Sequence, residues 1–381
     1  MMNHQKPIYA PALRMKAGEL IGVGDLAADI AGRILPRMIV PPPNERDDAL
    51  QTKIPMAEPV PDISHALAPV WSKKPVLIDS GYLLDEFGRD RMSSWLPHMF
   101  ERARKADVWA IPSASLSDLG ALEIAAFKDA LNDDAAIKFG LTVSSSDLAD
   151  RAGLQRAVDV LEQLDIDAAQ CVVTVDFHDA DLSQPDFVAP IIGAALDDLQ
   201  ALALWQSIVF QGTNYPEKNP ADPNGHYIVP RTEWLAWKRA VNFDPTTAEH
   251  MMFGDYAADC SKLSFGGGGG MAIRHIRYAT EDGWLVQRGP NTGSHGSAMR
   301  KVCEAIVSSG KFAGQDFSKA DEQIYRCSKG VASLGTAKVW RGINTCHHIT
   351  RVVRDIGNIK GFEFEKRAPA PVELQDELFN R

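Results

Sequence analysis

A carboxylate and an imidazole lie at the end of one of the most apolar stretches of the chain, Cys171 to Asp179. Side chains of an extended strand alternate between its two faces, so Thr174, Asp176 and His178 share one face and the intervening apolar residues share the other. Asp176 could act as a general base that His178 orients, or both could be ligands of a divalent metal ion.

Two more aspartates end apolar runs. Asp79 closes the run VLID and Asp255 lies in FGDY, and we expect both at matching heights at strand ends. Together with Asp176 they would suit an oxygen-rich Mg²⁺ site or a paired acid and base. The alternative for each is the common structural use of Asp as a helix cap after a strand. The candidate catalytic residues are therefore Asp79, Asp176, His178 and Asp255, and the candidate metal ligands are the three aspartates.

Cations and amides follow two other apolar runs. Arg14 and Lys16 share a face by alternation, with Glu19 just beyond them, so they could clamp an anionic group. A surface pair of Arg and Glu is the alternative. Gln211 and Asn214 begin a loop dense in hydrogen-bonding groups, and loops late in a barrel often cradle a phosphate. These five residues are the candidate substrate-binding set.

Other chemically capable residues have structural alternatives. Lys138 lies early in the run IKFGLTV, where it could be a buried base, but we favour a paired position at the rim. The run Gly266 to Gly270 could hold phosphate, yet no P-loop pattern follows it and a hinge is favoured. His347 and His348 point about 100° apart on a helix, so we expect them to be structural.

Eight short apolar runs alternate with stretches of helical periodicity, which is typical of repeated βα units. Several runs are apolar throughout, as in strands covered on both faces. Eight such strands close most economically into a barrel, because closure removes exposed edges. We therefore expect one (β/α)8 TIM-barrel-like domain of the α/β class. The predicted strands are Tyr9 to Met15, Ile34 to Val40, Val76 to Asp79, Val108 to Pro112, Ile137 to Val143, Cys171 to Phe177, Ser207 to Gln211 and Met252 to Tyr256.

The barrel is expected to span residues 1–362, with an insertion after strand eight at residues 261–336 that contains a hairpin and a helix. Arg274, Arg277 and Arg288 of that hairpin could rim a ligand site or form a solvated face. Trp340 and Arg341 are expected to pack or cap the barrel. Residues 41–75 are rich in proline and predict an extended connection, and residues 363–381 predict a flexible tail.

Composition limits the class of protein. The 381 residues are 45% hydrophobic and 24% charged, as in an ordinary globular protein. A net charge of −10 argues against general nucleic-acid binding. Five dispersed cysteines without a C-x-x-C pair favour reduced thiols and a cytoplasmic location. No signal peptide is apparent, and Asp197 and Asp198 interrupt the most apolar stretch, so we expect no membrane segment.

Five blocks of the chain resemble the "beta protein" family of bacteriophages and bacteria: YAPALRMKAGEL, ILPRMIVPPP, VVTVDFHD, FGDYAAD and WRGINTCHHITRVV. The resemblance extends to about Ile356. It implies a barrel-type domain of uncertain activity, found in phages and in mobile or defence-associated regions of bacterial genomes. No catalytic residue carries over, because the resemblance brings no established mechanism.

The last residues contain the pattern Q-x-x-L-F, formed by Gln375, Leu378 and Phe379 after a Pro/Ala linker. Short peptides of this kind dock on bacterial DNA sliding clamps by burying Leu and Phe in a groove. A frayed amphipathic end is the alternative.

Two functions remain open from the sequence. The first is a ligand-binding or hydrolytic barrel that acts on an anionic, phosphate-bearing small molecule or nucleotide in a phage or defence-associated context, with acid–base or Mg²⁺ chemistry. The second is a non-catalytic protein-interaction component of a phage or anti-phage defence system. Polar strand-end residues that converge in an open cavity would favour the first, and an apolar plug would favour the second.

Overall fold

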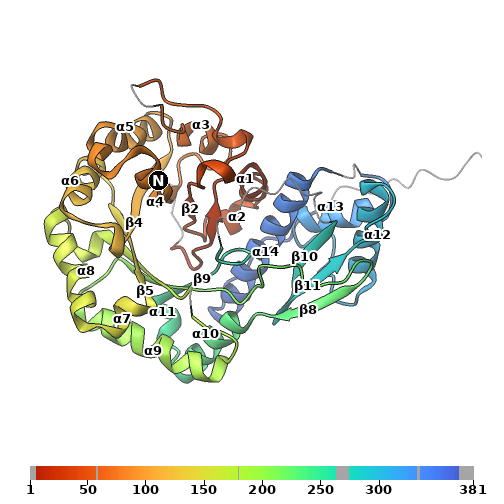
Figure 1. Cartoon of the computed structure of the whole chain (residues 1–381). Coiled ribbons are helices and arrows are strands. Elements are labelled where there is room, and N and C mark those ends of the chain that lie inside the picture. The colour runs from red at the N-terminus through yellow and green to blue at the C-terminus, as the bar shows by residue number, and fades with distance from the viewer. Residues whose placement is uncertain (1–5, 57–58, 179, 263–273, 333–334, 369–381) are drawn as a thin grey trace, which may run out of the picture.

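Parallel strands form the centre of the protein (Figure 1), and eight of them are hydrogen-bonded in the order β1-β2-β3-β4-β5-β6-β7-β9. The computed structural model describes residues 6–56, 59–178, 180–262, 274–332 and 335–368. The sheet closes where Tyr9 bridges Phe253 in parallel and the Ala10 N–H donates to the Phe253 carbonyl at 2.9 Å. The predicted α/β barrel is therefore confirmed. Its strands are β1 (Ala12–Arg14), β2 (Arg37–Ile39), β3 (Pro75–Asp79), β4 (Trp109–Ser115), β5 (Phe139–Ser144), β6 (Cys171–Asp176), β7 (Ser207–Gln211) and β9 (Met251–Gly254).

Helices surround the strands in a ring. α8 shows why: its buried residues recur at three and four spacing, so one apolar stripe covers the sheet. Residues 41–75, predicted as an extended connection, contain 3₁₀ turns and the short α3. The ring contains α1 (Ala17–Gly24), α2 (Ala28–Ala31), α3 (Ile63–Leu67), α4 (Gly81–Phe87), α5 (Met92–Lys105), α6 (Ala121–Ala130), α7 (Ser145–Ala149), α8 (Arg151–Leu164), α9 (Pro185–Leu202), α10 (Thr232–Phe243) and α11 (Thr247–His250).

The interior of the barrel changes from apolar to polar along the strands. Near the amino ends it is filled by Ala10, Leu35, Leu77, Ile111, Val172, Val209 and Met252. Side chains on one face of a strand recur every second residue. Two positions further toward the carboxyl ends, the side chains that face the interior therefore include Arg37, Asp79, Ser113, Thr174 and Gln211. The apolar layer closes the bottom of the barrel, and the polar residues lie at the carboxyl ends of the strands.

A second sheet lies beside the barrel and is antiparallel, in the order β10-β11-β8. The predicted hairpin forms β10 (His275–Ala279) and β11 (Gly283–Arg288). The third strand, β8 (His226–Pro230), comes from the segment between β7 and α10, so this unit is built from more than an insertion after the last barrel strand. α12 (His295–Ser308), α13 (Lys319–Ser328) and α14 (Ala337–Ile359) complete it, and we call it the added unit.

α14 joins the added unit to the barrel by packing against α1. The two helices approach so closely that a Cβ at Gly22 would lie 2.7 Å from the Gly342 carbonyl oxygen. Glycine is therefore required at this crossing. All five cysteines are buried and free of disulfides. Within the described part of the chain, no helix combines the length and apolarity needed to cross a bilayer.

Candidate functional site

A cavity of about 460 Å³ opens at the carboxyl ends of the barrel strands, and we call it the acidic cavity. Its lining is dominated by carboxylates and hydroxyls, with Arg37 and Lys262 as its cationic side chains and His178 at one side. No bulky apolar plug fills it. The carboxylates are Asp79, Asp85, Asp118, Asp147 and Asp176, and the hydroxyls belong to Tyr82, Ser115, Ser117, Thr142, Ser144, Tyr256 and Ser261.

A buried ion pair forms one wall of this cavity. Arg37 Nη2 lies 2.9 Å from Asp176 Oδ2, and its Nη1 donates to Thr142 Oγ1 at 3.0 Å. The Tyr256 hydroxyl donates to Asp176, 2.7 Å from Oδ2. Burial and the neighbouring carboxylate raise the pKa of Tyr256 well above its usual value, so the phenol stays a donor. Asp176 is thus held as a hydrogen-bonded, ion-paired acceptor.

Asp79 has a different environment from Asp176, although both line the acidic cavity. Its Oδ1 accepts the Gly81 N–H at 3.1 Å. Burial raises the pKa of Asp79, the Arg37 charge lowers it, and the charges of Asp118 and Asp176 raise it further. Two carboxylates whose environments differ in this way can divide the roles of acid and ionised partner.

His178 lies at the rim of the acidic cavity. Its side chain is 52% exposed, and Nδ1 is 3.8 Å from Asp176 Oδ1. The structure therefore brings Asp79, Asp176 and His178 to one cavity, and their catalytic roles stay predictions.

Asp255 does not join them, because it follows β9 on the face that points out of the barrel. Its Oδ2 accepts from His348 Nε2 at 2.7 Å, and its Oδ1 accepts from the Tyr9 hydroxyl. The Trp284 indole N–H can only donate and lies 3.3 Å from His348 Nδ1, so the imidazole proton is on Nε2. Asp255 therefore links the barrel to the added unit. The three-aspartate site is not formed, and the described residues contain no group of three or more His, Cys, Asp or Glu suited to a metal ion.

A second cavity of about 300 Å³ adjoins the first, and we call it the arginine cavity. A small gap lined by Ile39, Tyr256, Arg14 and Asp259 shares residues with both, so the two cavities lie next to each other. The lining of the arginine cavity consists of Arg14, Lys16, Glu19, Glu217, Asp259, Arg277 and Arg341. The mouth of the barrel therefore has an end rich in carboxylates and an end rich in arginines.

Three guanidinium groups converge on Asp259 in the arginine cavity. Arg14 Nη2 lies 3.0 Å and Arg341 Nη2 2.7 Å from Oδ2, and Arg277 Nη1 lies 2.6 Å from Oδ1. Burial alone would raise the pKa of Asp259, but the arginine charges hold it far below its usual value. Arg341 also donates to Glu19 at 2.9 Å. Two of the three arginines belong to the added unit.

The predicted substrate-binding residues are only partly brought together. Arg14, Lys16 and Glu19 line the arginine cavity, where Lys16 Nζ lies 2.7 Å from Glu45 Oε2. Gln211 is buried inside the barrel, and the Asn214 N–H donates to Glu233 Oε2 at 3.1 Å, so neither lines the two cavities.

The remaining candidates lie away from the mouth. Lys138 precedes β5 at its amino end, with Nζ 4.0 Å from Asp133 Oδ1, which is the rim position that the sequence favoured. His347 and His348 are buried in α14. The glycine run 266–270 and the residues Gln375, Leu378 and Phe379 lie outside the described residues.

Sequence reasoning missed Arg37, Tyr256 and Asp259. Arg37 had a usable signal, because a cation inside the apolar run LPRMIV of a strand covered on both faces must find a buried partner. Asp259 had none: its partners are distant in the chain, at positions 14, 277 and 341.

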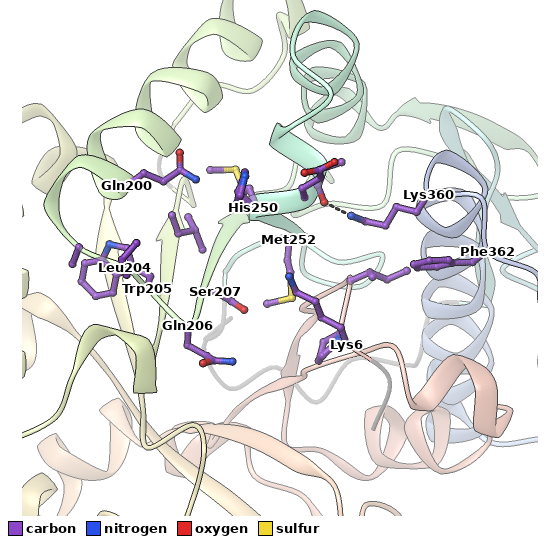
Figure 2. A pocket seen from close by; sticks show the side chains of 17 residues that line it. Lys6, Gln200, Leu204, Trp205, Gln206, Ser207, His250, Met252, Lys360 and Phe362 are labelled. Carbon is purple, nitrogen blue, oxygen red and sulfur yellow. Dashed lines mark hydrogen bonds between the residues drawn. The ribbon is translucent and has the colours of Figure 1, made fainter. Parts of the chain in front are cut away.

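A third cavity, of about 370 Å³, lies at the opposite end of the barrel (Figure 2). Lys6, Ser207, Met252, Lys360 and Phe362 are among its lining residues, and Lys360 Nζ donates to the Ala248 carbonyl. Barrel enzymes carry their chemistry at the carboxyl face, and the amino face contributes to stability. The two cavities at the carboxyl face are therefore the candidate functional site.

The family model described as Beta protein matches residues 9–354, nearly the whole chain. A search of curated proteins finds no significant match.

Proposed function

The chain belongs to the beta protein family, and on that premise we propose that the mouth of its barrel binds a small phosphate-bearing molecule, such as a nucleotide. The observation that carries the proposal is the convergence of polar strand-end side chains in an open cavity instead of an apolar plug. Concave sites with a few convergent polar groups are the usual form of small-molecule sites. The site is assigned from its geometry, because a barrel fold alone does not specify a function.

The charges of the two cavities determine which end of the ligand would lie in each of them. Five aspartates in the acidic cavity would repel a phosphate, whereas the guanidinium groups of the arginine cavity match phosphate geometry. The phosphate would therefore lie beside Arg277 and Arg341. The hydroxyl-bearing part of the ligand, such as a sugar, would reach the carboxylates and hydroxyls of the acidic cavity.

Binding to the arginine cavity has a direct test. Arg277→Met should weaken nucleotide binding about tenfold, because it removes one charged donor from the phosphate. Isothermal titration calorimetry with nucleoside mono- and diphosphates measures the change. Arg239→Met removes the same charge from the exposed face of α10 and should leave affinity unchanged. A wild-type protein that binds none of these nucleotides contradicts the proposal.

The same site could hydrolyse its ligand by acid–base chemistry. Water would add at a carbon of the part of the ligand that lies in the acidic cavity, the bond from that carbon to its leaving oxygen would break, Asp79 would give that oxygen a proton, and His178 would accept the proton of the water. The raised pKa of Asp79 supports its role as the acid.

Asp79→Asn separates binding from turnover. The variant should bind nucleotide within about threefold of wild type. It should form product at least about 100-fold more slowly, because general acid catalysis contributes a factor of about 10² to 10⁴ to the rate. Chromatographic analysis of products measures the rate. Asp85→Asn, which removes a more exposed carboxylate of the same cavity, is the matched control. Equal product formation by wild type and Asp79→Asn would exclude this chemistry.

Absence of both binding and turnover would favour a non-catalytic interaction component. Phe187 and Ile191, exposed and one turn apart on α9, are a surface that such a component could use. The phage or defence context, and docking on a sliding clamp through the tail, remain predictions from the sequence.

A further inference from the structure

Asp259 occupies the position in which an anionic ligand would meet the arginines. The three guanidinium groups that surround it are largely buried, with side chains 12%, 16% and 21% exposed, against 8% for Asp259. Counting Glu19, which accepts from Arg341, three cations face two carboxylates. Among the described side chains, the cluster therefore carries more positive than negative charge in a partly desolvated place, which favours a more highly charged anion.

The backbone before Asp259 adopts an unfavourable conformation. Ala257 has a φ of 48° and Ala258 a φ of 60°, in the left-handed region that residues with a Cβ disfavour. The Ala257 N–H donates to Asp255 Oδ1 at 2.9 Å, which fixes the start of the turn. Asp259 follows the two strained residues, and its contacts with the three arginines offset the cost of their conformation. Release of Asp259 from the cluster would let the turn relax.

The cluster lies beside an open cavity and near the buried hydroxyl group of Tyr215. The arginine cavity of about 300 Å³ opens directly beside Asp259. The Tyr215 ring lies 4.6 Å from the Arg277 guanidinium, and its buried hydroxyl has no hydrogen-bond partner among the described residues. Burial raises the pKa of Tyr215 to about 12, so this hydroxyl remains protonated and can donate. A buried donor without a partner is costly, and this hydroxyl lies near enough to the cluster for the charges of Arg277 and Asp259 to shift its pKa.

We propose that Asp259 is a resident substitute for the phosphate of the ligand: its carboxylate fills the three-arginine site in the empty protein, and a tetrahedral dianion displaces it and binds the same guanidinium groups. The inference rests on the proposed function, because it assigns the phosphate subsite of that ligand. It adds that binding releases the turn at residues 255–262. The exchange breaks no covalent bond, since one anion replaces another.

The test is titration of the full chain with inorganic phosphate. Asp259→Asn should bind phosphate at least about tenfold more tightly than wild type, because the competing negative charge is gone. Asp198→Asn removes the same charge from the exposed face of α9, away from the cavities, and should change affinity less than about threefold. If Asp259 instead serves to hold the arginines in place, Asp259→Asn will bind phosphate equally or more weakly, which overturns the proposal.

A second measurement uses the wild-type protein, so it stands even if Asp259→Asn fails to fold. Hydrogen exchange of the amides at residues 255–262 should become faster at saturating phosphate, because the turn loses its contact with the arginines. Slower or unchanged exchange overturns the displacement.

These results are separable from the proposed function. Nucleotide binding by wild type with no gain for Asp259→Asn would keep the function and reject the displacement. A gain in phosphate affinity without any nucleotide binding would keep the anion site and reject the nucleotide.

Discussion

Replacement of Arg37 by Met is expected to destabilise the protein by about 3 to 5 kcal/mol, because it leaves a buried carboxylate without its cation. Arg37 lies 2.9 Å from Asp176 and 3.0 Å from Thr142, and both members of the ion pair have side chains only 6% exposed. After the substitution Asp176 would keep the Tyr256 hydroxyl as a donor, but a phenol does not neutralise a charge. The loss would be larger than that of an ordinary hydrogen bond.

Urea unfolding of matched variants measures this effect. Lys128→Met breaks the exposed ion pair with Asp165 and should cost less than about 1 kcal/mol. The double variant Arg37→Met/Asp176→Leu removes both charges and should recover at least half of the loss, since buried ion pairs are often no better than apolar replacements. A loss below about 1 kcal/mol for Arg37→Met would show that the pair is not buried in solution.

The barrel was predictable because its signal is local and repeated. Each strand is a short apolar run, and alternation alone placed Asp176 and His178 on the face that lines the acidic cavity. The same rule explains Asp255. Gly254 pairs in register with Gln211, whose side chain points inward, so Asp255 lies one residue past it and faces outward. One residue of error in the height of a strand end moved a candidate catalytic residue to the opposite face.

The sequence marked Arg14, Lys16 and Glu19 as candidates for binding an anion, but the convergence of three arginines on Asp259 could not be predicted, because it depends on contacts between distant segments. β8 is a five-residue strand in which only Val229 is buried, and it pairs with β11 about 55 residues later. Arg277 and Arg341 reach Asp259 only because β10 and α14 pack beside the barrel. Sequence periodicity describes what one segment does and carries no information about which segments meet.

The added unit therefore has a consequence for the site as well as for the fold. It supplies two of the three guanidinium groups at the mouth, and its α14 is joined to the barrel through His348 and Asp255. Displacement of this unit would remove the anion end of the site and leave the acidic cavity. The proposed ligand, which needs both ends, should bind only when barrel and added unit are assembled.

Glu233 makes the joint between barrel and added unit sensitive to pH. It is fully buried at the start of α10, where Oε2 accepts the Asn214 N–H and Oε1 has no partner among the described residues. Burial raises the pKa of Glu233 to about 8, the Arg231 charge lowers it, and the Asp255 charge raises it. The folded protein therefore holds a proton on Glu233 that the unfolded chain, with a pKa near 4.5, releases.

The sign follows from the raised pKa. Stabilisation by the protonated group is complete below about pH 4.5 and is lost as pH rises through about 8. Glu233→Gln imitates the protonated form at every pH, so the free energy of unfolding of this variant lacks this pH-dependent loss. The variant should therefore exceed wild type in free energy of unfolding by an amount that grows from pH 5 to 8 and reaches up to about 5 kcal/mol at pH 9, at about 1.36 kcal/mol per pKa unit.

Urea unfolding of both proteins at intervals between pH 5 and 9 gives this difference directly. Glu249→Gln, on the exposed side of α11, should show a difference from wild type that does not vary with pH. If the difference for Glu233→Gln is equally flat, the carboxyl group is already ionised in the folded protein, and Arg231 balances its charge. A slope confined to the Glu233 variant would instead show that ionisation of the buried carboxyl group destabilises the folded protein as pH rises.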